Sequence, residues 1–177
     1  MNDLIVLLDQ AGRPSGTADR LAIHTGDTPY HLAFSSYLFN ADGMVLLTRR
    51  ALGKKTWAGV WTNSCCGHPR PGEDLHDAVV RRVTEELGHA PEGLRLMLDS
   101  FSYRATDAGG IVENELCPVW VGTYHPHLLA PDPQEVMGTA WVPWHTVVDI
   151  VAEAPELLSP WAVRQVPLLD AKLKENR

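Results

Sequence analysis

The sequence predicts an α/β (α+β) fold in which helices flank a mixed β-sheet in layers. Strand-length apolar runs outnumber helical patterns, and the two kinds of segment are interleaved along the chain. The 177 residues, 45% hydrophobic and 21% charged, suffice for a buried core without disulfides. Because the sequence contains no repeat, low-complexity tract or linker-like stretch, we expect residues 1–177 to form a single domain.

The first half of the chain is expected to supply strands. Leu4–Leu8 has the composition of a buried strand, and the Gly, Pro and Ser residues within Gly12–Gly16 indicate a turn after it. Leu32–Phe39 and Met44–Thr48 are aromatic or apolar enough for two further strands. Asn40–Gly43, between them, is typical of a tight turn, so these two strands should form a hairpin.

The second half is expected to begin with the clearest helix of the chain, Asp74–Leu87. Apolar residues recur there at every fourth position, and Gly88 follows as a C-terminal stop. Further strands are predicted over Phe101–Arg104, Gly110–Tyr124 and, shorter than the others, Ala140–Val142.

Two more helices are expected near the C-terminus. The first runs from Trp144 to Glu153. The second should begin at Ser159, which is typical of an N-cap and is followed by Pro160 in the first turn. Pro167 lacks a backbone N–H, so it should kink or split this helix.

Composition argues against two classes of partner. The net charge of −7, from 15 basic and 22 acidic side chains, argues against general nucleic-acid binding. No apolar run approaches the roughly 20 residues that cross a bilayer, and Leu4–Leu8 is too short for a signal peptide. We therefore expect a cytoplasmic protein with no membrane partner. Its three cysteines should be reduced thiols that either fill the core or carry chemistry.

One part of the chain departs from the acidic average. No acidic residue lies between Asp42 and Glu73, whereas five basic residues do. A solvated face would explain such a run, but its position beside the reactive residues described next favours an anion site. The basic residues are Arg49, Arg50, Lys54, Lys55 and Arg70.

The segment Trp61–Pro69 holds the densest set of reactive side chains. If it is extended, Cys66 and His68 share one face and Cys65 points to the other. A thiol and an imidazole that project together suit metal ligation or proton transfer, although two buried structural residues would explain the pattern equally well.

Two carboxylates and two further imidazoles extend this set. Glu113 and Glu115 lie two apart among apolar neighbours and should share a strand face, where buried carboxylates need a cation or a shared proton. An exposed edge strand is the alternative. His24 and His31 join His68 to complete three imidazoles and two carboxylates. This mixed set suits a divalent ion of higher coordination, such as Mn²⁺, Zn²⁺ or Co²⁺, better than a structural zinc.

The loop-helix segment Gly67–Gly88 resembles the Nudix box, the motif of a superfamily whose helix glutamates hold Mg²⁺ against a diphosphate. The resemblance implies that role for Glu86, and Mg²⁺ generally prefers one or two carboxylates together with phosphate oxygens. Arg82 stands where the box has a glutamate that hydrolases of this class generally need. The departure counts against diphosphate hydrolysis.

A longer set of motifs resembles the type I isopentenyl-diphosphate isomerases, a Nudix-fold family that does not hydrolyse its substrate. The resemblance implies a Nudix-like catalytic domain that converts isopentenyl diphosphate to dimethylallyl diphosphate. The motifs are His24, which precedes His31–Ser36, and then Leu47–Lys55, Trp57–Ser64, Cys66–Pro69, Tyr103–Ala105, Glu113–Pro118 and Ser159–Trp161.

The resemblance also implies a role for each site residue. One divalent metal, Mn²⁺ or Zn²⁺, would be bound by His24, His31, His68, Glu113 and Glu115. Mg²⁺ would arrive with the substrate and meet Glu86. The diphosphate would contact Arg20, Arg50, Lys54 and Arg82. Arg20 replaces the lysine of most family members, which changes reach and hydrogen-bonding geometry.

The implied reaction protonates an alkene and passes through a tertiary carbocation. Cys66 and Glu115 would be the opposing acid/base groups, and Tyr103 would assist Glu115. The indole face of Trp161 would stabilise the cation by about 2 kcal/mol when desolvated, although from the sequence alone core packing would explain this residue better.

Two other functions remain open at this stage. A Nudix hydrolase of a small diphosphate would explain the box, and a non-catalytic metal- or phospholipid-binding module would explain the ligand set. We expect a monomer acting on a small molecule.

Overall fold

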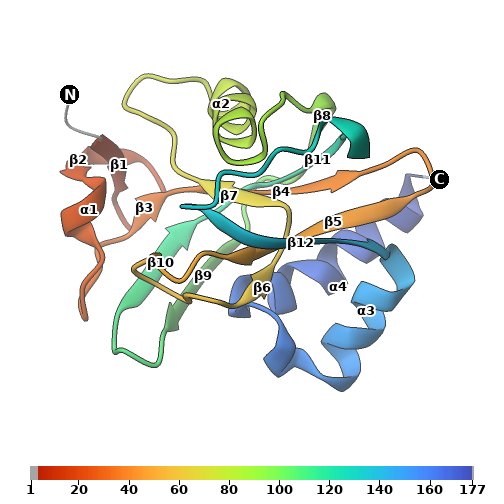
Figure 1. The fold of residues 1–177 in the computed structure, drawn as a ribbon. Helices are drawn as coiled ribbons and strands as arrows, with labels where there is room; N and C mark the ends of the chain where they lie inside the picture. The colour runs from red at the N-terminus through yellow and green to blue at the C-terminus, as the bar shows by residue number, and fades with distance from the viewer. Residues whose placement is uncertain (1–3, 177) are drawn as a thin grey trace.

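The computed structural model describes residues 4–176 (Figure 1). Its strands form two mixed sheets, not one, and helices cover both faces of the larger sheet. The predicted α+β class is therefore confirmed. Among the described residues, no helix is both long and apolar enough to cross a membrane.

The strands of the smaller sheet are, in spatial order, β2 (Pro14–Asp19), β1 (Leu4–Leu8), β3 (His31–Leu32), β10 (Val112–Leu116) and β9 (Ser102–Thr106). The larger sheet has the order β12 (Val136–Pro143), β5 (Met44–Arg50), β4 (Phe34–Phe39), β11 (Val119–Thr123) and β8 (Glu92–Leu98), with β6 (Trp61–Thr62) paired to β5 and β7 (Cys65–Gly67) paired to β4. The helices are α1 (Arg20–Ile23), α2 (Leu75–Leu87), α3 (Trp144–Glu153) and α4 (Pro160–Glu175), with short 3-10 turns η1 (Pro126–Leu128) and η2 (Pro155–Leu157).

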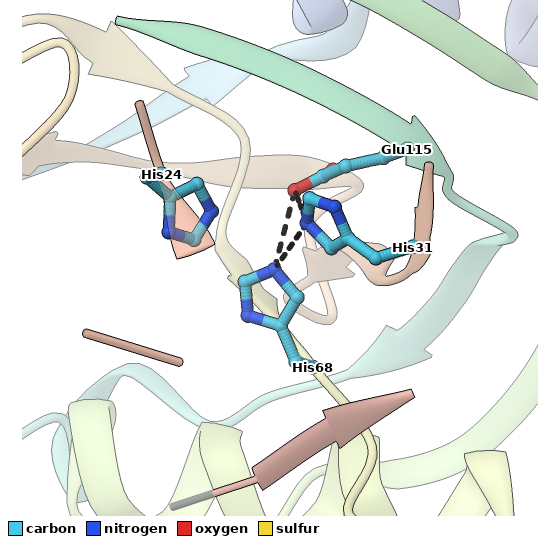
Figure 2. Close-up of side chains that lie close together, drawn as sticks. All are labelled: His24, His31, His68 and Glu115. Atoms are coloured by element: carbon cyan, nitrogen blue, oxygen red, sulfur yellow. Dashed lines mark hydrogen bonds and ion pairs between the residues drawn. The ribbon is translucent and has the colours of Figure 1, made fainter. Parts of the chain in front are cut away.

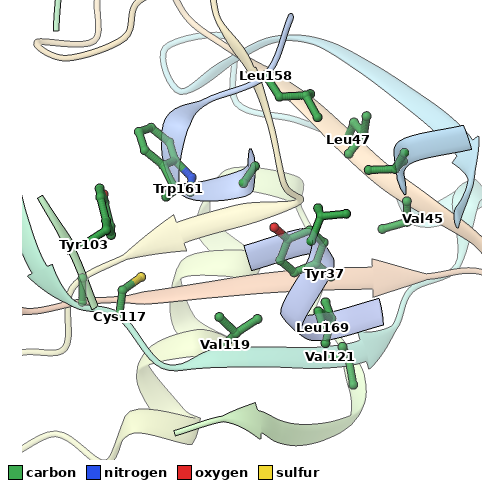
Figure 3. Close-up of a cluster of buried hydrophobic side chains, with 14 residues drawn as sticks. Tyr37, Val45, Leu47, Tyr103, Cys117, Val119, Val121, Leu158, Trp161 and Leu169 are labelled. Carbon is green, nitrogen blue, oxygen red and sulfur yellow. The ribbon is translucent and has the colours of Figure 1, made fainter. Parts of the chain in front are cut away.

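The core lies on both faces of the larger sheet because side chains alternate along its strands. On β4, Phe34 and Leu38 belong to the cluster that packs against α2, whereas Tyr37 belongs to the cluster that contains α4 residues. Figure 3 shows the second cluster, in which Trp161 lies near Tyr103. This second cluster therefore forms one wall of the region where the two sheets meet.

Two of the expected strands each divide between the sheets. Leu32–Phe39 breaks at Ala33 into β3 and β4, and Gly110–Tyr124 breaks at Pro118 into β10 and β11. The breaks lie side by side, since the Ala33 N–H donates to Leu116 O at 2.8 Å and β3 and β4 run parallel to β10 and β11. Proline has no N–H for the ladder, so it suits the point where the strand changes sheet.

The predicted hairpin is confirmed. β4 and β5 are antiparallel with Phe39 opposite Val45. The Asn40 side chain accepts from the N–H groups of Asp42 and Met44 and holds the turn closed. Gly43 has φ 74°, a left-handed conformation that favours glycine.

Two edge strands are absent from the sequence prediction, and a third strand is underestimated. Pro14–Asp19 is β2, so the expected turn at Gly12–Gly16 ends earlier than predicted. β8 was not predicted, and β12 is longer than the expected Ala140–Val142. β2 and β8 lie at sheet edges and expose much of their surface. β2 lacks the apolar alternation that reveals a half-buried strand, whereas Leu94, Leu96 and Leu98 of β8 do recur at every second position, a signal that the prediction missed.

The predicted helices are present. Asp74 caps α2 by accepting from the His76 N–H, and Gly88 ends it in the left-handed conformation. α3 has its predicted bounds. Pro167 does not split α4, which is continuous from Pro160 to Glu175. Pro167 is exposed, so water can hydrate the carbonyl group that loses its hydrogen bond there.

Candidate active site

A cleft of about 330 Å³ opens where the two sheets meet. This volume lies in the range of small-molecule sites. Every residue proposed from the sequence for metal binding, diphosphate binding or catalysis lines the cleft, except His31, Tyr103 and Glu86. His31 and Tyr103 are buried behind it, so residues from distant parts of the sequence form one site.

Three residues that line the cleft and one buried histidine form a histidine–carboxylate cluster (Figure 2). Ligand atoms of His24, His31, His68 and Glu115 all lie within 4.8 Å of one another. His31 on β3 is paired with Glu115 on β10, His24 follows α1 and His68 follows β7. The Nε2 atoms of His31 and His68 are 3.2 Å apart, and Glu115 Oε1 is 3.5 and 3.3 Å from them, respectively.

The tautomers of these histidines fit a bound cation. Nδ1 of His31 lies 2.9 Å from the Pro29 carbonyl and Nδ1 of His24 lies 3.2 Å from the Arg20 carbonyl. A carbonyl only accepts, so each Nδ1 carries the proton and each Nε2 presents a lone pair to the centre. Lone pairs that face one another repel unless a cation lies between them. The residues present therefore fit a divalent metal.

Glu113 lies at the edge of the cluster. Its Oε1 accepts from Thr56 Oγ1 at 2.7 Å. Its Oε2 lies 3.0 Å from His24 Nε2, but both atoms are buried without a hydrogen-bond partner. Two such orphaned buried acceptors are costly unless a positive charge compensates them. The unpaired atoms of His24 and Glu113 thus support the same cation site as the His31, His68 and Glu115 atoms.

The charges of the cluster are coupled through Glu115. Burial alone would raise the pKa of Glu115, but the neighbouring His31 and His68 imidazoles hold that pKa well below its usual range. Burial dominates at His68 and lowers its pKa. At His31, burial is outweighed by Glu115, which raises its pKa. The carboxyl group is therefore ionised, as a metal ligand must be.

A cationic rim lies beside the metal cluster. The Arg50 guanidinium donates to the Thr56 carbonyl from Nε at 3.1 Å and from Nη2 at 3.0 Å. Lys54 forms an ion pair with Glu135, and Arg20 begins α1 at the cleft wall. The proposed diphosphate-binding residues thus lie together, although they are separated in the sequence.

Arg82 connects this rim to α2. It forms ion pairs with Glu86, with Glu85 at 2.9 Å and with Glu135 at 3.3 Å. Burial would lower the pKa of Arg82, but Glu86 and Glu135 together raise it. Glu86 is buried against Arg82 and does not belong to the histidine cluster. The structure thus separates the proposed Mg²⁺ ligand from the proposed histidine site.

The two adjacent cysteines point in opposite directions, as strand alternation predicts. Cys66 lines the cleft, whereas Cys65 is 2% exposed in the core beneath α2. Burial raises the pKa of the Cys66 thiol to about 11, against smaller lowering effects from Ser35 and Asn63. All three cysteines of the chain are free thiols.

Trp161 lines the cleft, and other aromatic rings pack around it. The ring centroids of Trp161 and Tyr103 are 5.8 Å apart, and Trp57 meets Trp161 edge-on at 5.4 Å. The Arg50 guanidinium carbon lies 5.6 Å from the Trp161 ring centroid. Trp161 thus combines core packing with a face near the cleft. Burial raises the pKa of the Tyr103 hydroxyl well above its usual range, so it is a neutral donor.

Sequence reasoning missed several residues of the site. Glu135, Thr56 and Asn63 each contact a predicted site residue. Asn63 lies within the Trp61–Pro69 segment and Thr56 lies two residues after Lys54, but neither side chain has the charge or nucleophile that identified its neighbours. Their contacts, like those of Glu135, form only in the tertiary fold. A second cluster, Asp74, His76 and Asp77, is exposed at the start of α2, where Asp74 acts as the helix cap.

Comparisons with known proteins agree with this geometry. The NUDIX domain family matches residues 29–168. Solved structures share the fold: DR0079 from Deinococcus radiodurans has a TM-score of 0.71 at 17% identity, covering 93% of this chain and 98% of that one. The MutT protein from Methanosarcina mazei has a TM-score of 0.66 at 22% identity, covering 84% and 96% of the two chains. The family match and the shared fold thus define a protein of the Nudix class.

Curated relatives narrow the class. The isopentenyl-diphosphate Delta-isomerase of Frankia alni is 57% identical over 94% of this chain and 85% of the relative. That of Mycolicibacterium vanbaalenii is 54% identical over 96% and 92% of the two chains. The chain belongs to the isopentenyl-diphosphate Delta-isomerase family within the Nudix superfamily.

Proposed function

We propose that this enzyme converts isopentenyl diphosphate to dimethylallyl diphosphate, and that residues 1–177 act as one catalytic domain. The observation that carries the proposal is the single cleft that holds a thiol, an ionised carboxylate, an indole face and a cationic rim. Family membership at 57% identity supports the same activity. The diphosphate is held as a handle while the reaction occurs on the carbon chain.

The cationic rim binds the diphosphate in this proposal. Arg20, Arg50, Lys54 and Arg82 lie along one side of the cleft. Two of these cations are paired with Glu135 in this structure, so the substrate exchanges one anionic partner for another. Glu86 beside Arg82 is the proposed protein contact of the Mg²⁺ that arrives with the substrate.

Cys66 and Glu115 are the proposed acid/base pair. One group protonates the terminal carbon of the alkene, which leaves a tertiary carbocation at the adjoining carbon. The other group removes a proton from the carbon on the far side of that cation, and the double bond forms there. Tyr103, which lies opposite Glu115 on the paired strand β9, is the residue that assists Glu115 in this proposal. The Trp161 face stabilises the cation, and the buried walls of the cleft exclude water that would trap it.

The histidine cluster is the proposed site of one Mn²⁺ or Zn²⁺ ion, held by His24, His31, His68, Glu113 and Glu115. A metal held there would orient the Glu115 carboxyl and tune its acidity. His31 and His68 hold that carboxyl in place through their contacts with Oε1. We also propose that the enzyme works in the cytoplasm on a small molecule, which its three free thiols support. The monomeric state stays a prediction.

The test is incubation of the purified enzyme with Mg²⁺ and isopentenyl diphosphate. We expect dimethylallyl diphosphate without inorganic phosphate. Phosphate release without the isomer would support a hydrolase of a small diphosphate instead, and metal uptake without turnover would support a binding module. Arg82 argues against the hydrolase, because an arginine paired with Glu86 occupies the place of a box glutamate.

A further inference from the structure

Asn63 is fully buried in the loop between β6 and β7, next to the acid/base thiol in space. Its amide NH₂ group donates to the Ser36 carbonyl at 3.0 Å and to the Cys65 carbonyl at 2.9 Å. Both partners are backbone oxygens of paired strands and can only accept. These two bonds fix the orientation of the amide, so its carbonyl oxygen faces the cleft side.

The carbonyl oxygen of Asn63 meets two groups of the proposed machinery. The Trp161 indole N–H donates to Oδ1 at 2.9 Å, and the Cys66 thiol donates to the same oxygen at 3.2 Å. Thr62 Oγ1 donates at 2.8 Å. One oxygen thus accepts hydrogen bonds from both a thiol on β7 and an indole on α4, two elements that are far apart in the sequence.

We propose that Asn63 is a positioning residue for the isomerisation. Its side-chain oxygen fixes the position of the Cys66 thiol relative to the face of the Trp161 ring. The proposal rests on the proposed function. A proton transfer that forms a carbocation needs the transferring group and the stabilising ring held together within fractions of an ångström. The oxygen reaches both side chains, and the fully bonded amide keeps it still.

The strength of the contacts suits this role. An amide oxygen has two lone pairs, and the O–H of Thr62 and the N–H of Trp161 are stronger donors than a thiol. The Cys66 S–H is therefore the weakest of three donors. It can leave Oδ1 for the substrate at small cost while the indole stays anchored. On the other side of the thiol, Ser35 Oγ lies 3.4 Å away and limits its rotation.

The test compares Asn63→Leu with a matched control, Ser36→Ala. Both variants lose a buried hydrogen bond to the Cys65 carbonyl, but the Ser36 hydroxyl donates to that carbonyl and not to Asn63 Oδ1, the oxygen that binds the thiol and the indole. The folded fraction of each is measured from the stoichiometry of pyrophosphate binding. Asn63→Leu should lower kcat about 100-fold with KM within about twofold of wild type, because the diphosphate-binding rim is intact. Ser36→Ala should keep wild-type kcat.

A kcat of Asn63→Leu within a few fold of wild type, or a raised KM with unchanged kcat, would overturn the proposal. If Asn63→Leu does not fold, Asn63→Ser replaces it, since its cavity admits water to the stranded carbonyls. The same kcat loss is expected. If the wild-type enzyme has no isomerase activity, the proposed function is refuted. Pyrophosphate binding by the variants, compared with that of wild type, then still reports whether they are folded.

A double-mutant cycle separates positioning from general stability. Trp161→Phe keeps an aromatic ring but removes the N–H that binds Asn63. If the two residues act through this bond, Trp161→Phe should lower kcat less in the Asn63→Leu background than in wild type. Equal effects of Trp161→Phe in both backgrounds would contradict the proposal.

Discussion

Replacing each of the adjacent cysteines by alanine should separate catalysis from packing. Cys66 lines the cleft and donates to Asn63, whereas Cys65 is 2% exposed in the core that contains Phe34 and Val79. The two side chains have the same chemistry and are one residue apart. Any difference between the variants therefore reports on the direction in which each side chain points.

The two substitutions should differ in their effect on kcat, which only the loss of Cys66 should lower strongly. Loss of an acid/base group typically costs about 10²–10⁴-fold in kcat, so Cys66→Ala should lose nearly all turnover. Its Sγ contacts are with Ser35 and Asn63, so its unfolding free energy should change by about 1 kcal/mol or less. Cys65→Ala removes one buried heavy atom, which costs about 1 kcal/mol and lowers Tm by about 2–4 °C. Its turnover should be nearly that of wild type.

The assay is steady-state isomerisation of isopentenyl diphosphate with Mg²⁺, together with a thermal melt of each variant. Wild type measured in parallel is the control. If both substitutions reduced kcat equally, the alternation of Cys65 and Cys66 would have no catalytic meaning, and the reasoning that places the thiol in the cleft would be refuted.

Three further predictions concern the surroundings of the thiol. Gly67→Ala should lower both kcat and Tm, because a Cβ there would lie 2.8 Å from Arg82 Cγ and 2.9 Å from Phe34 Cζ. Such overpacking costs about 1–3 kcal/mol. Kinetics and a thermal melt that both match wild type would contradict this prediction. His31→Gln should weaken binding of Mn²⁺ or Zn²⁺ by about tenfold or more, as measured by metal titration, since even changes outside the ligand shell cost this much; unchanged affinity would exclude His31 as a ligand. In EDTA, the rate of Cys66 alkylation by iodoacetamide should rise about tenfold per pH unit between about pH 7 and 9. The Cys66 pKa of about 11 lies above this range, so the thiolate fraction increases across all of it. A rate that levels off near about pH 8 would contradict that pKa.

Local sequence patterns predicted the elements whose cause is local. α2 has apolar residues at every fourth position, an Asp74 cap and a Gly88 stop, and each of these signals acts within one or two turns. The Asn40–Gly43 turn is likewise held by bonds within four residues. Strand alternation also sufficed to separate Cys66 from Cys65, because a residue's face depends only on its position along the strand.

Long-range pairing could not be predicted in this way. The division of Leu32–Phe39 between two sheets depends on pairing with a segment more than 70 residues away, around Pro118. Glu135 reaches Lys54 and Arg82 only through the pairing of β12 with β5. In these cases the missing information lies in the partner segment. The edge strand β2 has exposed faces, so burial leaves no periodic pattern in its sequence. β8 differs, because Leu94, Leu96 and Leu98 recur at every second position and could have identified it.

Isomerisation of isopentenyl diphosphate in D₂O tests the central claim most directly. The claim is that the enzyme adds one proton to the carbon chain, removes another and leaves the diphosphate intact. NMR spectra of the product should show deuterium in a methyl group of dimethylallyl diphosphate and no inorganic phosphate. A product without solvent deuterium, or phosphate as the main product, would contradict it.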